Sequence, residues 1–297
     1  MNNLLQATHA AQVAQRKILD DLVEKSIPGQ DWEEFEPTQR LLLGYLLDRG
    51  HAVLRLVAIR LDFDAEILLR TFYEVSAKFM LITFTPEGER PEMLKEYWTA
   101  LGEVADRKTA YRAELAEAIV PPEKEDARNS LKLLQRKNIV RNNLSLNKAA
   151  RKRLEQKWSF PEVLQRLDGL AGAKRAGATS LLHVYGMASH LAHADCRAME
   201  LYLDRMFRPA DERIGLEDSH AARIMSDIAQ VGAYCAILAA SGANLGAEEN
   251  LQLVARTAKE VGTVASAVID DFDATQRDFY QSMMGDGLDE AAPPAER

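Results

Sequence analysis

The sequence predicts an all-α fold, a multi-helix bundle of about eight or nine helices. Apolar residues recur with the period of an α-helix in one segment after another, and no segment fits a strand better than a helix. Alanine, leucine, glutamate and arginine, which suit helices, are abundant, whereas aromatic residues make up only 7% of the chain. Proline and glycine separate the periodic segments, as expected at helix ends.

Four helices are expected in the first part of the chain, over residues 3–26, 37–61, 65–84 and 87–119. Each range follows the helical period of its apolar residues. Pro28 and Gly29 end the first helix, and Asp62 or Asp64 can cap the third. The third helix is apolar on nearly every side, which predicts a position in the centre of the core.

The second part of the chain begins with a basic excursion, residues 121–158. A helix with a cap near Ser159 and a proline in its first turn, Pro161, should end at Gly169. Three longer helices then follow, over residues 181–204, 216–241 and 247–284.

The helices are predicted to form a single domain, residues 1–284, followed by a disordered acidic tail, residues 285–297. The two cysteines, Cys196 and Cys235, are too few for a disulfide framework, which fits a reducing compartment. The sequence shows no leader-like pattern, and it lacks an uninterrupted apolar run of about 18 residues. We therefore expect a cytoplasmic protein with no membrane partner.

Most residues capable of chemistry lie in the predicted helix 181–204, called here the histidine helix, which holds three of the six histidines. At about 100° per residue, an arc of roughly 80° carries these imidazoles and one arginine. The residues in the arc are His183, His190, His193 and Arg197. The opposite side is apolar, so the helix should pack on the core and present a polar face.

A second polar edge lies on the third predicted helix. Four residues recur there at every fourth position with alternating sign: Glu66, Arg70, Glu74 and Lys78. This order favours ion pairs between successive turns. Charges inside a core are tolerated only when almost all of them are paired. We predict that Arg70 is mostly buried and bonds to Glu66, to Glu74 or to a partner on the histidine helix.

Other kinds of site find little support in the residues. The histidines could bind a metal ion only with carboxylates from a facing helix, for which Glu66 and Glu74 are the candidates. The HExxH motif is absent, and nearby arginines would repel a cation, so no metal is expected. Ser189 and His190 are neighbours that point about 100° apart on a helix, so they do not form a catalytic dyad. No phosphate loop or dinucleotide motif predicts a cofactor.

Charge is unevenly distributed along the chain. The net charge is −8, yet the segment from Lys132 to Lys157 holds nine basic residues against one acid. Such a stretch can bind phosphates or can be a solvated surface. If it binds RNA, residues 132–157 are the contact region, with Lys148, Arg151 and Arg153 facing the phosphates. The sequence also leaves open that the protein forms a homo-oligomer.

A metal-independent nuclease is the enzymatic alternative. Helical ribonucleases of the HEPN class use an Arg-x(4–6)-His motif, in which the imidazole transfers a proton and the guanidinium steadies the phosphate. Only Arg213 and His220 match this spacing, and a chain this rich in arginine yields such a match by chance. The same pair of groups could also be assembled by folding rather than by sequence spacing, with His190 lying beside Arg70 or Arg197.

Two short motifs resemble a known family. LRTFYE (Leu69 to Glu74) and YGMASHLAH (Tyr185 to His193) are similar to the Leu-Arg-Ser/Thr-x-x-Glu and Tyr-x3-Ser motifs, with a nearby His, of an uncharacterised family of all-helical bacterial proteins. The resemblance covers roughly residues 40–205. By position it implies site residues at Arg70, Glu74, Tyr185, Ser189 and His190. Some members resemble parts of stress or phage-defence loci, which leaves an RNA-directed role open without fixing an activity.

Two functions of different classes follow. The first is a ligand- or partner-binding module built round a polar network, and the residues of this network are Glu66, Arg70, Glu74, Tyr185, Ser189, His190, His193 and Arg197. The second is a HEPN-like ribonuclease in which His190, Arg70 and Glu74 are catalytic. The residues favour the first, because bundle stability explains most of the polar groups. They do not establish catalysis.

Overall fold

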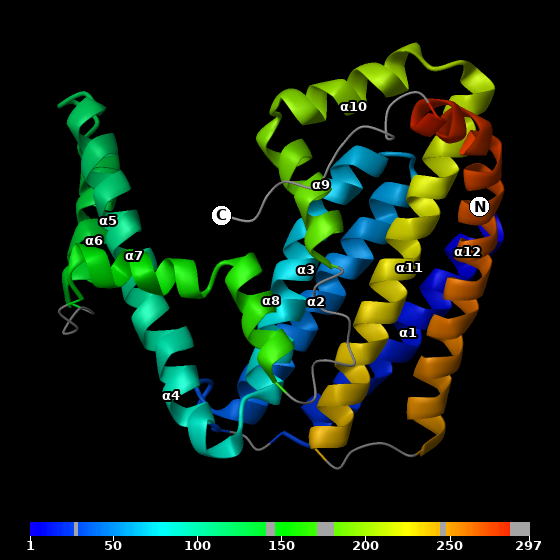
Figure 1. Ribbon diagram of the computed structural model, residues 1–297. Helices are drawn as coiled ribbons and strands as arrows, with labels where there is room; N and C mark the ends of the chain where they lie inside the picture. Colours follow the sequence, from blue (N-terminus) through cyan, green and yellow to red (C-terminus); the bar gives the residue numbers. More distant parts are fainter. Residues whose placement is uncertain (27–28, 141–145, 171–180, 244–247, 286–297) are drawn as a thin grey trace, which may run out of the picture. The chain divides into compact units, whose positions relative to one another are not determined.

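The computed structural model describes residues 1–297 apart from 27–28, 141–145, 171–180, 244–247 and 286–297. The described residues are helical almost throughout, and no strand occurs among them (Figure 1). The predicted all-α class is therefore confirmed. From residue 286 onward, the predicted disordered tail lies outside the described residues.

The helices follow one another along the chain. They are α1 (Asn2–Glu24), α2 (Phe35–Ala58), α3 (Asp62–Phe84), the 3₁₀ turn η1 (Glu87–Glu89), α4 (Arg90–Lys95), the π-helical turn η2 (Glu96–Ala100), α5 (Leu101–Ile119), α6 (Glu125–Val140), α7 (Lys148–Lys157), α8 (Phe160–Gly169), α9 (Leu181–His193), α10 (Cys196–Phe207), α11 (Ala210–Gly242) and α12 (Glu248–Gly285). Because α4, η2 and α5 form one continuous helix, the described residues contain eleven helices, more than the eight or nine predicted.

One additional helix comes from a break in the predicted histidine helix, which is in fact α9 followed by α10. Ala194 has a positive φ of 49°, which ends α9. The carboxylate of Asp195 then accepts hydrogen bonds from the backbone N–H groups of Arg197 (3.0 Å) and Ala198 (3.2 Å), so it caps a new helix. The prediction that Arg197 shares one helical arc with the three histidines is therefore wrong.

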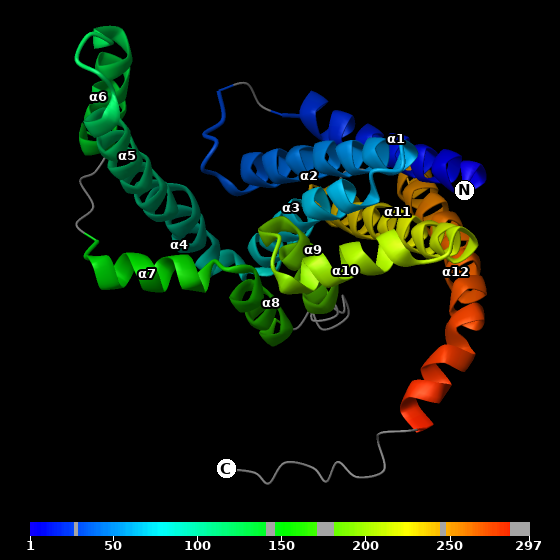
Figure 2. The ribbon, with the colours of Figure 1, turned by 90° about the horizontal axis from the view of Figure 1, so that it is seen from above.

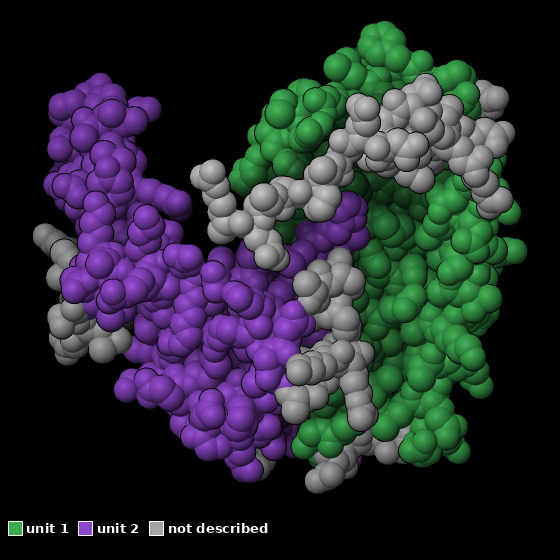
Figure 3. Space-filling view, viewed as in Figure 1, with its two compact units in different colours: residues 1–22, 44–73, 185–297 green, residues 23–43, 74–184 purple. Residues whose placement is uncertain are grey.

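The described chain divides into two compact units, which are coloured separately in Figure 3. Unit 1 comprises residues 1–22, 44–73 and 185–297, and unit 2 comprises residues 23–43 and 74–184. α2 and α3 each contribute residues to both units.

Unit 1 is a bundle of α1, α11, α12 and parts of α2 and α3. α11 and α12 run side by side in both views (Figures 1 and 2). On α1, the buried side chain of Gln15 donates to the backbone carbonyl of Ala229 on α11 (2.8 Å). Leu69, Phe72 and Tyr73 of α3 are almost fully buried, which confirms that this part of α3 is a core helix.

α11 was not expected to resemble a membrane span. Over Glu212–Gly242, however, it has the length and composition of one. The most apolar window of this helix is 56% buried inside the structure. The core helix of a globular bundle has the same properties, so the resemblance is only a weak indication of a membrane.

Unit 2 is built on the continuous helix of α4, η2 and α5. α6 lies alongside α5 in both views (Figures 1 and 2). In the π-helical turn, Glu96 accepts hydrogen bonds from the indole of Trp158 (2.5 Å) and from Lys157 (2.6 Å), which fixes the end of α7. The side chain of Asn147 accepts from the backbone N–H of Ala150 (2.9 Å) and caps α7.

Candidate functional site

α3 carries a row of polar residues into unit 1, and α9 and α11 supply partners to it. The row and its partners are Asp62, Glu66, Arg70 and Tyr73 of α3, Tyr185 and His193 of α9, and His220, Arg223 and Asp227 of α11. Glu66 and Arg70 lie one turn apart, because residues at i and i+4 share one face of a helix. Their contacts nevertheless lead to two different helices.

Glu66 lies at the centre of the contacts with α11. Its side chain is 0% exposed, and its Oε2 accepts from Nε2 of His220 (2.9 Å) and pairs with the guanidinium of Arg223. Burial alone would raise the pKa of Glu66. The hydrogen bond from His220 and the charge of Arg223 outweigh burial and hold this pKa below its usual value. Glu66 is therefore an ionised, paired carboxylate in the core.

Arg223 also links Glu66 to Asp227 of α11, which in turn binds Tyr73 of α3. Nη1 of Arg223 donates to Oδ2 of Asp227 (3.1 Å), and this oxygen also accepts from the Tyr73 hydroxyl (2.6 Å). Burial, reinforced by the charge of Asp227, raises the pKa of Tyr73, so the phenol remains a donor. We call these five residues, Glu66, Tyr73, His220, Arg223 and Asp227, the α11 network.

Asp62, the first residue of α3, is a second buried carboxylate. Neither of its oxygens has a hydrogen-bond partner among the described residues. Burial raises the pKa of Asp62, although the charge of Arg60 opposes this shift. Arg60 adopts a positive φ of 64° and pairs with Glu217 (3.1 Å) and Asp218 of α11. The environment of Asp62 therefore disfavours its charged form.

Contacts with α9 form around Arg70. Its Nε donates to the Tyr185 hydroxyl (3.1 Å), and its Nη1 lies 3.2 Å from Nε2 of His193. The guanidinium also lies over the Tyr185 ring, with 5.1 Å between Cζ and the ring centroid. Because a guanidinium can only donate, Nε2 of His193 is the acceptor in this contact. The predicted bond from Arg70 to the histidine helix is present, but the side chain is half-buried rather than mostly buried.

His190 forms a separate contact at the junction of α9 and α10. Its Nδ1 lies 2.6 Å from Oδ2 of Asp195, and its side chain is 46% exposed. The hydrogen bond from His190 lowers the pKa of Asp195. Because the carboxylate holds Nδ1, the other ring nitrogen, Nε2, faces the opposite side of the imidazole. This is the orientation that a general acid or base needs.

The other predicted residues of the polar network lie in different settings. Ser189 is half-buried on α9, and Glu74 is half-buried on α3, one turn beyond Arg70. Arg197 is exposed on α10 and pairs with Glu200 (2.7 Å), so its contact is a surface ion pair. The predicted role of these residues stays a prediction.

The phosphate-facing candidates of the basic stretch all lie on α7, in unit 2. Lys148 and Arg153 are exposed. Arg151 is half-buried and donates to the backbone carbonyl of Leu146 (2.5 Å). Two of the three basic side chains are thus exposed to solvent. This exposure is compatible with a phosphate-binding surface and equally with a solvated helix.

The α11 half of the site was missed from the sequence. His220 was considered only as a chance partner of Arg213, and neither Arg223 nor Asp227 was considered. A usable signal existed, because these three residues recur at i, i+3 and i+7 on a helix that is otherwise largely apolar. Polar residues with that spacing on a core helix predict a buried, paired face.

Comparison with known proteins identifies one family. Residues 41–210 match the model of a family of unknown function (DUF5677). The match corresponds closely to the span over which the motifs at Arg70 and Tyr185 resemble an uncharacterised family, and it ends before His220. No curated protein and no solved structure matches the chain.

Proposed function

Because this chain belongs to the DUF5677 family, whose function is unknown, we propose its function from the site itself. It is a helical module that binds an anionic, phosphate-bearing ligand at Arg70, Tyr185 and His193. A ligand-binding role was also the function that the sequence favoured.

The observation that carries the proposal is the position of Arg70 between the Tyr185 hydroxyl and Nε2 of His193. A guanidinium presents its N–H groups in a planar fork that matches the oxygens of a phosphate. The Tyr185 hydroxyl lies beside this fork, because it accepts from Nε of Arg70 (3.1 Å). His193 is exposed, so a ligand can reach this end of the trio from solvent.

Electrostatics favour an anion at this place. Arg70 brings a full positive charge to this place, and its Nη1 lies 3.2 Å from Nε2 of His193. An anionic oxygen bound there can accept from the guanidinium beside the imidazole. Glu66, one turn away on α3, does not cancel this attraction, because Arg223 is already paired with its carboxylate.

Isothermal titration with adenosine 5′-monophosphate and with sulfate tests the proposal. Arg70→Met and His193→Asn should each weaken binding at least about tenfold. His183→Asn is the matched control, since His183 is an exposed histidine on the same helix. Wild-type affinity in folded Arg70→Met would show that the ligand does not bind here.

A ribonuclease is the second candidate, and the contact between His190 and Asp195 supports it. A metal-independent nuclease needs a proton-transfer group in addition to an arginine that steadies the phosphate. His190, held at Nδ1 by a carboxylate, has the geometry of that group. His190→Asn should then abolish cleavage of a fluorescent single-stranded RNA in excess chelator while leaving sulfate binding intact. RNA that stays uncleaved by the wild type would eliminate this candidate.

A further inference from the structure

α10 exposes an apolar stripe on the surface of unit 1. The residues of this stripe, called here the α10 stripe, are Met199, Leu203, Met206 and Phe207. The first three recur at i, i+4 and i+7 and therefore share one face of the helix. All four are exposed, and Phe207 is 77% exposed. A row of large apolar side chains in water is unfavourable unless another surface covers it.

The other side of α10 is anchored to unit 1. Ala198 is buried, and Arg205 donates to Glu217 of α11 (2.7 Å). At the edge of the stripe, Tyr202 is 51% exposed and also contacts Phe63 of α3, with 6.5 Å between the ring centroids. These contacts fix the orientation of α10 on unit 1. The α10 stripe therefore faces solvent while other residues of the same helix contact the bundle.

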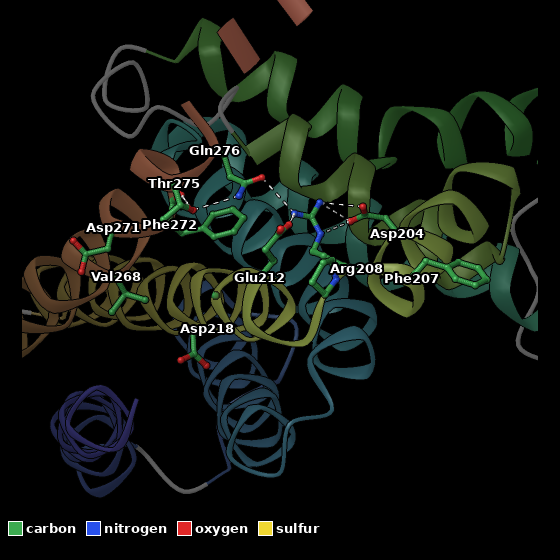
Figure 4. Close-up of a pocket in the computed structure, with 12 residues that line it drawn as sticks. Asp204, Phe207, Arg208, Glu212, Asp218, Val268, Asp271, Phe272, Thr275 and Gln276 are labelled. Atoms are coloured by element: carbon green, nitrogen blue, oxygen red, sulfur yellow. Dashed lines mark hydrogen bonds and ion pairs between the residues drawn. The ribbon is translucent and has the colours of Figure 1, made fainter. Parts of the chain in front are cut away.

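The α10 stripe borders a pocket of about 910 Å³, and Phe207 is one of the residues at its edge (Figure 4). α10, α11 and α12 form its walls, and Val268 and Phe272 of α12 make part of the surface apolar. The charged lining residues are Asp204, Glu212, Asp218, Asp271 and Arg208. Carboxylates thus outnumber the guanidinium four to one among the described lining residues.

Internal pairing removes only part of this negative charge. Arg208 donates to Asp204 (2.9 Å), and Asp218 pairs with Arg60. Glu212 lies 3.8 Å from the already paired Arg208, at the limit of an ion pair, and Asp271 is exposed on α12. Glu212 and Asp271 are therefore the carboxylates that a positively charged ligand group would meet in the pocket.

We propose that the α10 stripe and this pocket bind an amphipathic helix of a partner protein, one that carries lysine or arginine next to its apolar residues. The stripe receives the apolar face of that helix, and the pocket receives a basic side chain. Methionine side chains adapt to different apolar partners, which suits such a surface. Charge complementarity decides the class of partner.

The same charges disfavour two other occupants. A second copy of this face carries the same excess of carboxylates, so it is not complementary in charge to the pocket. A membrane surface rich in anionic lipid would be repelled by the same carboxylates. A basic amphipathic helix is complementary to both the stripe and the pocket.

The test is a fluorescence anisotropy titration of a labelled leucine–lysine peptide, about 18 residues long, with the full chain. A peptide with the same leucines and glutamate in place of lysine is the matched probe. We expect saturable binding of the lysine peptide that weakens with salt, and at least tenfold weaker binding of the glutamate peptide. Leu203→Ser with Met206→Ser, and separately Glu212→Lys with Asp271→Lys, should each weaken binding about tenfold or more.

Ile119→Ser on α5 is the control, because Ile119 is strongly exposed but lies outside the stripe. This variant should bind the lysine peptide like the wild type. Equal affinity for the two peptides, or wild-type affinity in both double variants, would overturn the proposal. So would sedimentation that shows a dimer of the chain dissociated by Leu203→Ser with Met206→Ser. Binding to phosphatidylserine vesicles that depends on the α10 stripe would assign the stripe to a membrane and would also overturn it.

Discussion

Glu66 on α3 and His220 on α11 are joined by a hydrogen bond of 2.9 Å between Oε2 and Nε2, although 154 positions separate them in the sequence. Arg223 pairs with the same carboxylate oxygen. Removing one partner of a buried ion pair leaves an uncompensated charge in the core. The donors of α11 are therefore expected to be structural residues of unit 1.

Arg223→Met should lower the free energy of unfolding by about 3–5 kcal/mol, because Glu66 keeps its charge and loses its cation. Urea denaturation followed by circular dichroism measures this difference. Arg197→Met is the control, since Arg197 forms an exposed pair with Glu200 and should leave the midpoint unchanged. Similar midpoints for the two variants would contradict the structural role of Arg223.

Glu66 also links stability to pH. Its pKa in the folded protein is lowered from the usual 4.5. A carboxylate of this kind stabilises the fold fully above its unfolded pKa, and the stabilisation disappears as the pH falls through the folded pKa. Glu66→Gln should therefore be less sensitive to acid than the wild type below about pH 4.5. Unfolding free energies measured from neutral pH to about pH 3 should converge for the two proteins, and parallel curves would contradict this.

The helical class and most helix boundaries were predictable, because every buried helix needs an apolar side and that side recurs with a fixed period. The break between α9 and α10 could not be predicted in this way. Ala194 and Asp195 change the direction of the chain through one positive φ and one N-cap, and neither alters the apolar period around them. Residues 181–204 consequently fitted a single helix in the sequence.

Several residues of the candidate site were predictable, Glu66 from the i,i+4 row on α3 and others from the two recognised motifs. Arg70, Tyr185 and His193 belong to those motifs, and the structure brings them together. The partners of Glu66 were not predictable from the i,i+4 order on α3, because tertiary packing decides which helix faces a side chain. Arg223 of α11 holds the buried pairing that the sequence assigned to Arg70.

Asp62 should have the opposite effect to Glu66. Its pKa is raised by burial from the usual 3.8, so its charged form is destabilising in the folded protein. Asp62→Asn removes the charge at almost the same volume and should raise the free energy of unfolding at neutral pH by about 1 kcal/mol. The gain should shrink as the pH falls and disappear well below pH 3.8, where the carboxyl is protonated in both states.

Asp64→Asn is the matched control for this substitution. Asp64 is exposed in the same first turn of α3, where a negative charge favours the N-terminus of the helix. This variant should not be stabilised. Thermal unfolding of both proteins at neutral pH makes the comparison, and a gain for Asp64→Asn equal to that for Asp62→Asn would show that burial is not the cause.

Gly232 on α11 faces Gln15 of α1 at close range. A β-carbon at residue 232 would lie 2.6 Å from Oε1 of Gln15. Gln15 is 1% exposed, and it donates to the carbonyl of Ala229, so it cannot move aside without losing a buried hydrogen bond. Gly232→Ala should therefore cost about 1–3 kcal/mol, although alanine is the better helix former.

Gly262→Ala on α12 is the control for Gly232→Ala, because it shows how replacing a helical glycine affects stability when the neighbouring side chain can move. A β-carbon there would lie 2.9 Å from Nε2 of Gln230, but Gln230 is exposed and can rotate into solvent. Gly262→Ala should then keep the gain in helix propensity, up to about 1 kcal/mol, and be neutral or stabilising. Urea denaturation of the two variants should give changes of opposite sign or at least of very different size. If Gly262→Ala is destabilised as much as Gly232→Ala, the buried hydrogen bond of Gln15 is not what restricts residue 232.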